Sequence, residues 1–346
     1  MNFLFLYTEL ADYFINCCKT LSAHGTVHIV RWPVNKEAPF QFTFPAGIKV
    51  YDKNNYTNNQ LVKLVEEIKP SIIVCSGWID KDYLKLVKPY YKKIPTVLAC
   101  DTHWNGSLKQ YIASFLSPFF LKNRFSHAWV PGEPQSKYVR KLGFKSGNIH
   151  KGFYCCDLEK FNFEYDRVSA LKNNIPHKFL YVGRYYDFKG ITDMWAAFIQ
   201  LQEETPNDWE LWCLGTGSVE PVKHPKIKHF GFVQPKDLGP ILDQCGVFVL
   251  PSRFEPWGVV VQEYAAAGFP LLLSKEAGAA EAFLEEDRNG YSFQKENVPE
   301  IKECFKKIIS LDNNSLLKMR EQSHRIGQKI TPADWTNTVM NIINGY

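Results

Sequence analysis

Residues 249–270 read VLPSRFEPWGVVVQEYAAAGFP, and this stretch decides the fold of the second half of the chain. It starts with a short apolar run, which predicts a strand that ends near Pro251. The segment Val259–Ala267 has the length and composition of a helix, and Gly258 stands immediately before it. A strand that leads through a loop into a helix is the unit from which parallel sheets are built, and Glu255 lies in that loop.

The start of this helix predicts a binding site for an anion. The backbone amides of Gly258, Val259 and Val260 have no acceptor within the helix and point toward its N-terminal end. Glu263, on the same helix, is placed to accept hydrogen bonds from a ribose, and Glu255 to accept them from sugar hydroxyls. In the alternative, Glu255 interacts with the helix dipole and Glu263 is a solvated residue. The apolar neighbours of Glu263 favour the functional interpretation.

A second loop of the same half carries two cations. Residues 183–190 read GRYYDFKG and lie between a run that predicts a strand and a helix that begins near Ile191. Arg184 at the strand end and Lys189 at the helix entry can converge on one anion, because arginine offers a planar fork of donors and lysine a compact charge. The alternative is two surface cations that flank a turn.

Short apolar runs alternate with helix-like segments along the whole chain. The expected strands are 3–7, 27–32, 71–75, 96–100, 127–130, 179–182, 209–214, 227–230, 247–250 and 270–273. The expected helices are 11–21, 61–68, 81–90, 108–121, 134–142, 191–202, 237–244, 259–267 and 332–343, with a loop at 33–45. This alternation predicts an α/β fold of two doubly wound, Rossmann-like domains whose binding loops face a shared central cleft.

The domain organisation follows from a break in this rhythm. Residues 151–176 mix Gly, Cys, Asp and Asn with scattered aromatic residues, which predicts an interdomain linker. We therefore expect one domain at residues 1–152 and a second that begins at residue 153. A chain of 346 residues suits two such domains better than one.

The composition is that of an ordinary globular protein. The formal net charge is +5 and no long run of Lys and Arg occurs, so nucleic-acid binding is not expected. The nine cysteines include no C-x-x-C pair and no cluster with zinc spacing, which predicts buried, reduced thiols. Residues 1–7 read MNFLFLY without a basic start, and no apolar run nears the roughly 20 residues that span a bilayer. We expect a cytoplasmic protein, or one that is peripheral at the membrane.

Five motifs follow one another in the second half. They are Gly183-Arg184 with Lys189-Gly190, Leu214-Gly-Thr-Gly217, Gly231-Phe-Val233, the stretch from Pro251-Ser252 through Glu255 and Glu263 to Gly268-Phe-Pro270, and Asn289-Gly290-Tyr-Ser-Phe293. In this order and spacing they resemble the retaining glycosyltransferases of the GT-B fold, glycosyltransferase family 4 (glycosyl transferases group 1). The two glutamates eight positions apart, after Pro-Ser, are the most specific feature of this resemblance.

The resemblance implies a role for each of these positions. The residues implied to bind a nucleotide-sugar donor are Gly183, Arg184, Lys189, Gly215, Val233, Gln234, Glu255, Trp257, Gly258, Val259, Val260 and Glu263. Arg184 and Lys189 would hold the diphosphate and Glu255 the transferred sugar, and all three are implied in catalysis. Val233 and Gln234 would lie against the base. No metal and no cofactor are implied, since cationic side chains and helix dipoles hold the leaving diphosphate in this family.

The first half matches this family in architecture more than in motifs. The turn after the first strand reads TELAD at residues 8–12, without the glycine that is usual there. The loop at residues 101–107 reads DTHWNGS, and the family often places a functional His or Asp in this loop. That implies Asp101 as the first candidate and His103 as the second, whereas Trp104 stacks on a sugar or fills the domain edge. By the same resemblance, residues 153–330 would be the donor-binding domain, and residues 331–346 would cross back onto the acceptor-side domain as a helix.

Two further segments of the first half allow two interpretations each. Asp80 and Asp82 superficially suggest the metal-binding pair of a different glycosyltransferase fold, but a helix N-cap and a first-turn charge are the preferred interpretation. Residues 110–124 mix aromatic and basic side chains. A core helix with charged ends is the preferred interpretation, and a helix that rests on a membrane and meets a lipid-linked acceptor is the alternative.

The sequence as a whole predicts a retaining, metal-independent glycosyltransferase of polysaccharide or glycoconjugate biosynthesis. Its donor would be a UDP-, GDP- or ADP-sugar, and its acceptor the hydroxyl of a glycan, a lipid-linked sugar or a small molecule. Two alternatives are a nucleotide-sugar epimerase on the same fold and a non-catalytic subunit that binds nucleotide sugars. A nicotinamide dehydrogenase fits less well, because no strand is followed by a full G-x-G-x-x-G.

Overall fold

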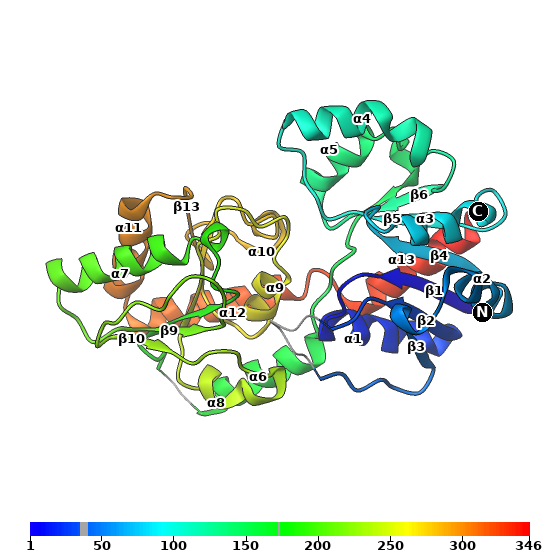
Figure 1. Cartoon of the computed structure of the whole chain (residues 1–346). Coiled ribbons are helices and arrows are strands. Elements are labelled where there is room, and N and C mark those ends of the chain that lie inside the picture. The colour runs from blue at the N-terminus through cyan, green and yellow to red at the C-terminus, as the bar shows by residue number, and fades with distance from the viewer. Residues whose placement is uncertain (35–40, 172–173) are drawn as a thin grey trace. The chain divides into compact units, whose positions relative to one another are not determined.

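This computed structural model of the chain describes residues 1–34, 41–171 and 174–346. These residues form two compact units: unit 1 comprises residues 1–157 and 330–346, and unit 2 comprises residues 158–329. Each unit is an α/β body built on one parallel sheet (Figure 1). Part of the loop expected at 33–45 and part of the linker expected at 151–176 lie outside the described residues.

Unit 1 contains a sheet of seven strands in the order β3-β2-β1-β4-β5-β6-β7, and every neighbouring pair is parallel. The strands are β1 Asn2–Tyr7, β2 Thr26–Arg31, β3 Ile48–Asp52, β4 Ile72–Ser76, β5 Thr96–Ala99, β6 His127–Trp129 and β7 Ile149–His150. The helices are α1 Asp12–Leu21, α2 Asn58–Ile68, α3 Lys81–Val87, α4 Leu108–Phe120, α5 Glu133–Lys141 and α13 Pro332–Asn344.

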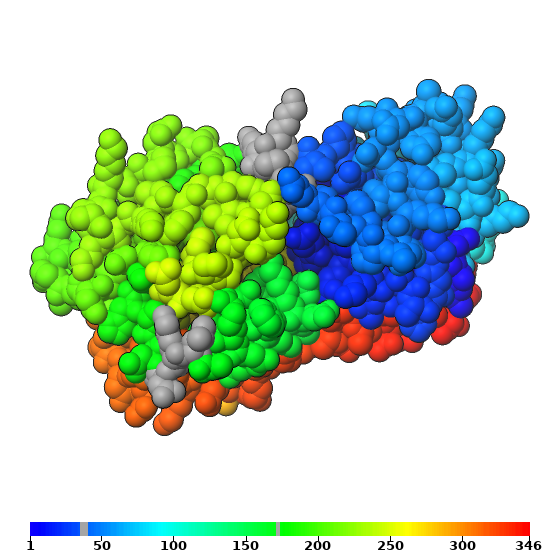
Figure 2. Space-filling model, turned by 90° about the horizontal axis from the view of Figure 1, so that it is seen from below, coloured from blue at the N-terminus to red at the C-terminus, as the bar shows by residue number. Residues whose placement is uncertain are grey.

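The last helix of the chain, α13, belongs to unit 1 because of one tryptophan. Trp335 is buried against α1 and the central strands, with its ring 5.7 Å from that of Phe5 and 4.8 Å from that of Trp129. Its Nε1 donates to the carbonyl of Phe153 at 2.8 Å. The C-terminal residues accordingly lie against the N-terminal residues of the same unit in the space-filling view (Figure 2).

Unit 2 contains a sheet of six strands in the order β10-β9-β8-β11-β12-β13, again with every neighbouring pair parallel. The strands are β8 Lys178–Val182, β9 Glu210–Leu214, β10 Ile227–His229, β11 Val247–Leu250, β12 Leu271–Ser274 and β13 Gly290–Phe293. The helices are α6 Leu158–Leu171, α7 Ile191–Glu204, α8 Gly239–Leu242, α9 Val259–Ala266, α10 Ala280–Phe283, α11 Val298–Ser310 and α12 Asn313–Gly327. Strand order and pairing in both sheets confirm the predicted doubly wound α/β class.

The linker predicted over residues 151–176 contains the boundary between the two units, which lies between Asp157 and Leu158, but much of it is helical. Helix α6 occupies 14 of these positions and packs on α9 in unit 2. Leu158, Phe161 and Val168 are buried at spacings of three and seven residues, which is one face of a helix. Polar residues between these positions hid the pattern, because the helix carries only a narrow apolar stripe.

Several other elements were not predicted: the strands β3, β7 and β13 and the helices α10, α11 and α12. Strand β3 is a five-residue edge strand whose residues are mostly half-buried, so its sequence lacks the continuous apolar run of a central strand. Helices α11 and α12 have many Lys, Glu and Asn residues and reach the core through a few positions on one side. Such helices depend on tertiary packing more than on their own composition.

The nine cysteines are all buried, as expected for structural thiols. Burial raises the pKa of the Cys75 and Cys18 thiols, which makes them poor nucleophiles at neutral pH. Among the described helices, none is long and apolar enough to cross a membrane.

Candidate active site

The strand order of unit 2 singles out one place for a ligand. Strands β8 and β11 are neighbours at the centre of the sheet, and the chain continues from β8 toward β9 on one side and from β11 toward β12 on the other. The loops that follow β8 and β11 therefore separate at the carboxyl edge of the sheet. In doubly wound sheets this switch point is the usual site of ligand binding.

Close backbone contacts join the loops after β8, β9 and β10. The Gly183 amide donates to the carbonyl of Leu214 at 3.0 Å, and the Tyr185 amide to that of Thr216 at 2.8 Å. The Gly215 amide donates to the carbonyl of Gly231 at 2.7 Å. A Cβ on Gly215 would lie 1.9 Å from the Gly183 carbonyl oxygen, so only glycine permits this approach.

The two predicted charges Lys189 and Glu255 form one ion pair. The Nζ of Lys189 lies 2.5 Å from Oε2 of Glu255, and both side chains are largely buried, with 17% and 12% exposed. The Ser252 hydroxyl donates to the same Oε2 at 3.3 Å. The sequence assigned Lys189 and Glu255 to different parts of a donor. The structure places them side by side. An anionic ligand at this point would therefore contact Lys189, and Glu255 would hold the lysine side chain in position.

Arg253 holds the two loops together, and sequence reasoning missed this residue. Its guanidinium donates to both carboxylate oxygens of Asp193, at 2.9 and 2.8 Å, and to Asp187 at 2.9 Å. The hydrogen bonds with Asp193 raise the pKa of Arg253. Its own amide donates to the carbonyl of Phe188 at 2.9 Å. The position of Arg253 in the loop between β11 and α9 was the sequence signal that could have pointed to this role. Its acidic partners could not be identified from the sequence, because they lie about 60 residues away.

The N-terminal end of α9 is exposed to this edge without a side-chain cap. Gly258 occupies the N-cap position with a left-handed φ of +89° and makes no side-chain cap hydrogen bond. A Cβ on Gly258 would lie 2.9 Å from Cγ of Glu255. The amides of Val259 and Val260 lie in that first turn, and Glu263 is four residues after Val259, so it shares a helix face with it.

The loop before α9 is fixed from the other side by the loop after β12. The carbonyl of Glu255 accepts from the Gly278 amide at 3.1 Å, and that of Trp257 accepts from the Ala279 amide at 2.9 Å. The Trp257 indole is buried against Phe283, with ring centroids 6.4 Å apart. Its side chain therefore supports the loop.

Arg184 and the predicted base-contacting residues lie at the same sheet edge. The Arg184 guanidinium lies 5.9 Å from the centre of the Tyr186 ring, and within the described ranges it has no acidic partner. Its carbonyl accepts from the Tyr181 hydroxyl at 2.9 Å. Val233 and Gln234 are half-buried in the loop after β10. An arginine without a carboxylate partner remains available for an anionic ligand.

In unit 1 the candidate Asp101 contacts a half-buried tyrosine, Tyr154. Asp101 follows β5, and its Oδ2 accepts from the Tyr154 hydroxyl at 3.2 Å. Burial, with Asp101 as the next cause, raises the pKa of Tyr154. The His103 carbonyl accepts from Gln110 at 2.7 Å, which fixes the backbone of this loop. The ring of Trp104 lies 4.8 Å from that of Tyr111, measured between ring centroids, and the ammonium group of Lys141 lies over the Trp104 ring. Trp104 therefore fills the domain edge.

The loops after β1 and β4 flank the switch point of unit 1. The hydroxyl of Thr8, just after β1, lies 3.1 Å from that of Ser76, the last residue of β4. The turn at residues 8–12 thus reaches the carboxyl edge of the sheet even though it contains no glycine.

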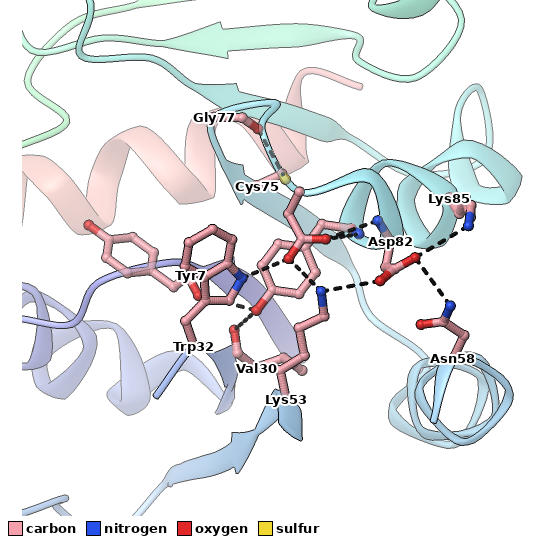
Figure 3. Close-up of polar contacts among 11 residues, drawn as sticks. Tyr7, Val30, Trp32, Lys53, Asn58, Cys75, Gly77, Asp82 and Lys85 are labelled. Carbon is pink, nitrogen blue, oxygen red and sulfur yellow. Dashed lines mark hydrogen bonds and ion pairs between the residues drawn. The ribbon is translucent and has the colours of Figure 1, made fainter. Parts of the chain in front are cut away.

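Asp80 is a helix N-cap, as predicted, and pairs with Lys53, which also pairs with Asp82; Figure 3 labels Lys53 and Asp82. Its Oδ1 accepts from the amides of Asp82 and Tyr83, at 2.9 and 3.1 Å. Its Oδ2 accepts from Trp32 Nε1 at 2.7 Å and from Lys53 Nζ at 2.6 Å. In the part of the chain that the structure describes, no group of three His, Cys, Asp or Glu side chains could hold a metal ion.

Replacing Asp80 with alanine is expected to destabilise unit 1 by about 3 kcal/mol, because it leaves the Lys53 ammonium without its buried partner. Burial opposes the ionisation of Asp80, but hydrogen bonds from Lys53 and Trp32 outweigh it and lower its pKa below 3.8. This contribution is therefore present above pH 3.8 and is lost as the pH falls through the lower folded-state pKa. Urea unfolding of the parent chain and of Asp80→Ala at pH 7 and pH 3 measures this contribution.

Asp82→Ala, which removes a more exposed carboxylate, serves as the control and should lower the free energy of unfolding by under about 1 kcal/mol. Equal losses for both variants would contradict this account.

Comparison with known proteins relates most of unit 2 to a family of glycosyltransferases. Residues 176–311 match the family Glycosyl transferases group 1. Glycogen synthase of Mycobacterium tuberculosis is 31% identical over 170 residues, which are 46% of this chain and 40% of that protein. Sulfoquinovosyl transferase SQD2 of Arabidopsis thaliana is 25% identical over 312 residues, 82% of this chain and 58% of that protein. The chain thus spans about half the length of these relatives.

A solved structure shows that the likeness in fold extends over the whole chain. The structure of Anabaena Alr3699/HepE in complex with UDP and glucose has a TM-score of 0.70 at 13% identity, and covers 99% of this chain and 100% of its own. At this identity the likeness concerns the fold. Residues 176–311 are thus similar to the group 1 glycosyl transferases, and the whole chain shares its two-domain α/β fold with this solved structure.

Proposed function

We propose that this protein is a retaining, metal-independent glycosyltransferase that transfers a sugar from a nucleotide diphosphate donor to a hydroxyl group. The carrying observation is the Lys189–Glu255 ion pair beside the uncapped start of α9, at the switch point of the sheet that matches the family. Unit 2 would bind the donor, and unit 1 would present the acceptor.

The donor diphosphate would lie between the cations and the first turn of α9. Lys189, Arg184 and the amides of Val259 and Val260 would neutralise the negative charge that grows on the leaving diphosphate. Because these groups already supply positive charge, the reaction needs no metal ion. Glu263 would accept hydrogen bonds from the ribose.

The sugar would be held by Glu255, whose carboxylate is already oriented by Lys189 and Ser252. Retention of anomeric configuration follows from the resemblance to family 4, and we assign it to attack of the acceptor on the same face from which the diphosphate leaves. The leaving phosphate would then take the acceptor proton, so that no carboxylate nucleophile is required. Asp101, with His103 as the second candidate, would contact the sugar from unit 1.

The experiment that tests this proposal is release of nucleotide diphosphate from a panel of UDP-, GDP- and ADP-sugars, with UDP-glucose first. We expect slow hydrolysis of one donor. Release of its nucleotide diphosphate should become faster when a suitable acceptor is present and should not change when EDTA is added. NMR of the product should show that the anomeric configuration of the donor sugar is retained. Glu263→Ala and Arg184→Ala should reduce release at least about a hundredfold. Glu203→Ala, at an exposed position of α7, serves as the control and should leave it unchanged.

Each alternative gives a different result in the same panel. An epimerase would change the sugar without an acceptor and without releasing nucleotide. A non-catalytic subunit would bind one nucleotide sugar and never release its diphosphate. Loss of activity in EDTA would overturn metal independence, and an inverted product would overturn the retaining mechanism.

A further inference from the structure

Helix α4 of unit 1 turns its apolar side chains outward. Six large apolar side chains on it are exposed: Leu108, Tyr111, Ile112, Phe115, Leu116 and Phe119. They follow one another at alternating spacings of three residues and one residue, which places them on one side of the helix. Phe115 and Phe119 are each 76% exposed. The preferred sequence interpretation, a core helix with charged ends, is therefore wrong.

The inward side of α4 is polar, and this fixes the orientation of the helix. The residues of α4 that are buried are Gln110 and Ser117. The Ser117 hydroxyl donates to the carbonyl of Leu142, at the end of α5, at 2.9 Å. The Gln110 side chain accepts from the Asn105 amide at 2.7 Å and donates to the His103 carbonyl. Helices α4 and α5 lie next to each other as a result (Figure 1).

The surroundings of this apolar face are strongly basic. Residues 102–151 contain eight Lys and Arg residues and one Glu, and no acidic residue occurs between positions 102 and 132. The whole chain has a formal net charge of only +5, so the rest of the chain is slightly acidic. The single acid, Glu133, is already paired with Arg140 and Lys151, at 2.5 and 2.6 Å. The exposed lysines of this segment at positions 109, 122, 137 and 145 remain for a partner.

We propose that the outward face of α4 binds the surface of an anionic lipid bilayer. A helix with an apolar side and a basic rim lies in the membrane interface, with its apolar side chains among the acyl chains and its lysines at anionic headgroups. At 13 residues α4 is about 20 Å long, which suits a helix that lies along the interface and is too short to cross it. This inference concerns unit 1 and does not depend on the proposed function of unit 2.

The charge around the outward face of α4 distinguishes an anionic bilayer from other binding partners. A second copy of the face would bring two basic rims together, and like charges across an interface oppose association. Nucleic acid would use the lysines but would leave six apolar side chains against a phosphate backbone. An anionic bilayer is complementary to both the apolar side and the basic rim.

The test is co-sedimentation of the full chain with vesicles of phosphatidylcholine alone or mixed with phosphatidylglycerol, without any donor. We expect binding to the mixed vesicles that weakens as salt is raised, because salt screens the lysines. Phe115→Ser with Phe119→Ser should lower the partition coefficient at least about tenfold. Phe163→Ser, on α6 of unit 2 and 64% exposed, is the matched control and should bind like the parent chain.

A second pair of variants tests the charge. Lys109→Glu with Lys122→Glu changes two exposed side chains and should abolish the preference for phosphatidylglycerol while the thermal unfolding midpoint stays unchanged. Three results would overturn the proposal: no binding to mixed vesicles, equal binding to neutral vesicles, or undiminished binding of the double phenylalanine variant. A dimer in analytical ultracentrifugation that the phenylalanine variant converts to monomer would assign the face to a second copy. Since no donor is present, none of these results depends on transferase activity.

Discussion

Lys189→Ala is expected to lower kcat/KM for the donor at least about a hundredfold. The lysine is the cation that lies within 2.5 Å of Glu255, at the point where the two donor loops meet. Without it, the charge that develops on the leaving diphosphate loses its nearest compensating group. Steady-state kinetics with the donor found in the panel measure the effect.

The same change should also lower the free energy of unfolding of unit 2 by about 3 kcal/mol, because Glu255 becomes a buried charge without its partner. Adding Glu255→Gln to Lys189→Ala should restore most of that stability and none of the activity. Lys302→Ala removes a lysine from another ion pair, 2.5 Å from the more exposed Glu204, and serves as the matched control. If the control lost as much activity as Lys189→Ala, the assignment of Lys189 to the donor would be wrong.

Gly190→Ala has the largest expected effect on stability, at least about 3 kcal/mol, with loss of donor binding. Gly190 has a φ of +63°, and a Cβ there would lie 2.1 Å from the carbonyl oxygen of Pro251. The loops after β8 and β11 would have to separate, and Lys189 would move away from Glu255. Denaturant unfolding and titration with UDP, GDP and ADP measure the two consequences.

Gly231→Ala is the control for this prediction. Its φ of +70° is similar, but no atom lies within 4 Å of the Cβ that alanine would add. It should cost only the left-handed conformation, about 1 kcal/mol. The difference between the two variants therefore isolates the clash, and equal unfolding midpoints would show that the two loops are not held together as described.

Most local structure of this chain could be predicted from its sequence. Central strands such as β11 are continuous apolar runs, and the glycines before α7 and α9 mark the starts of helices. These features depend on neighbouring residues, so a single sequence contains them. The predictions for α6 and α4 were wrong because local composition and tertiary role disagree there. Helix α6 was not predicted, because polar residues separate its buried positions. Helix α4 was predicted to be a core helix because it is rich in apolar residues.

The site divides in the same way. The sequence predicted that Lys189 and Glu255 belong to one donor site, but it assigned them to different parts of the donor, and the two residues are 66 positions apart in sequence. Their pairing, and the role of Arg253 as the link to Asp187 and Asp193, arise only when β8 and β11 become neighbours.

The sequence by itself determined the α/β class and the positions of the loops that follow the central strands. It also determined which charged residues lie in these loops. The tertiary structure decided which charges neutralise each other, which aromatic rings support a loop, and which apolar side chains remain exposed. The physical reason is distance. Strand and helix formation depend on residues within a few positions of one another, whereas ion pairing and burial depend on segments that only the folded sheet brings together.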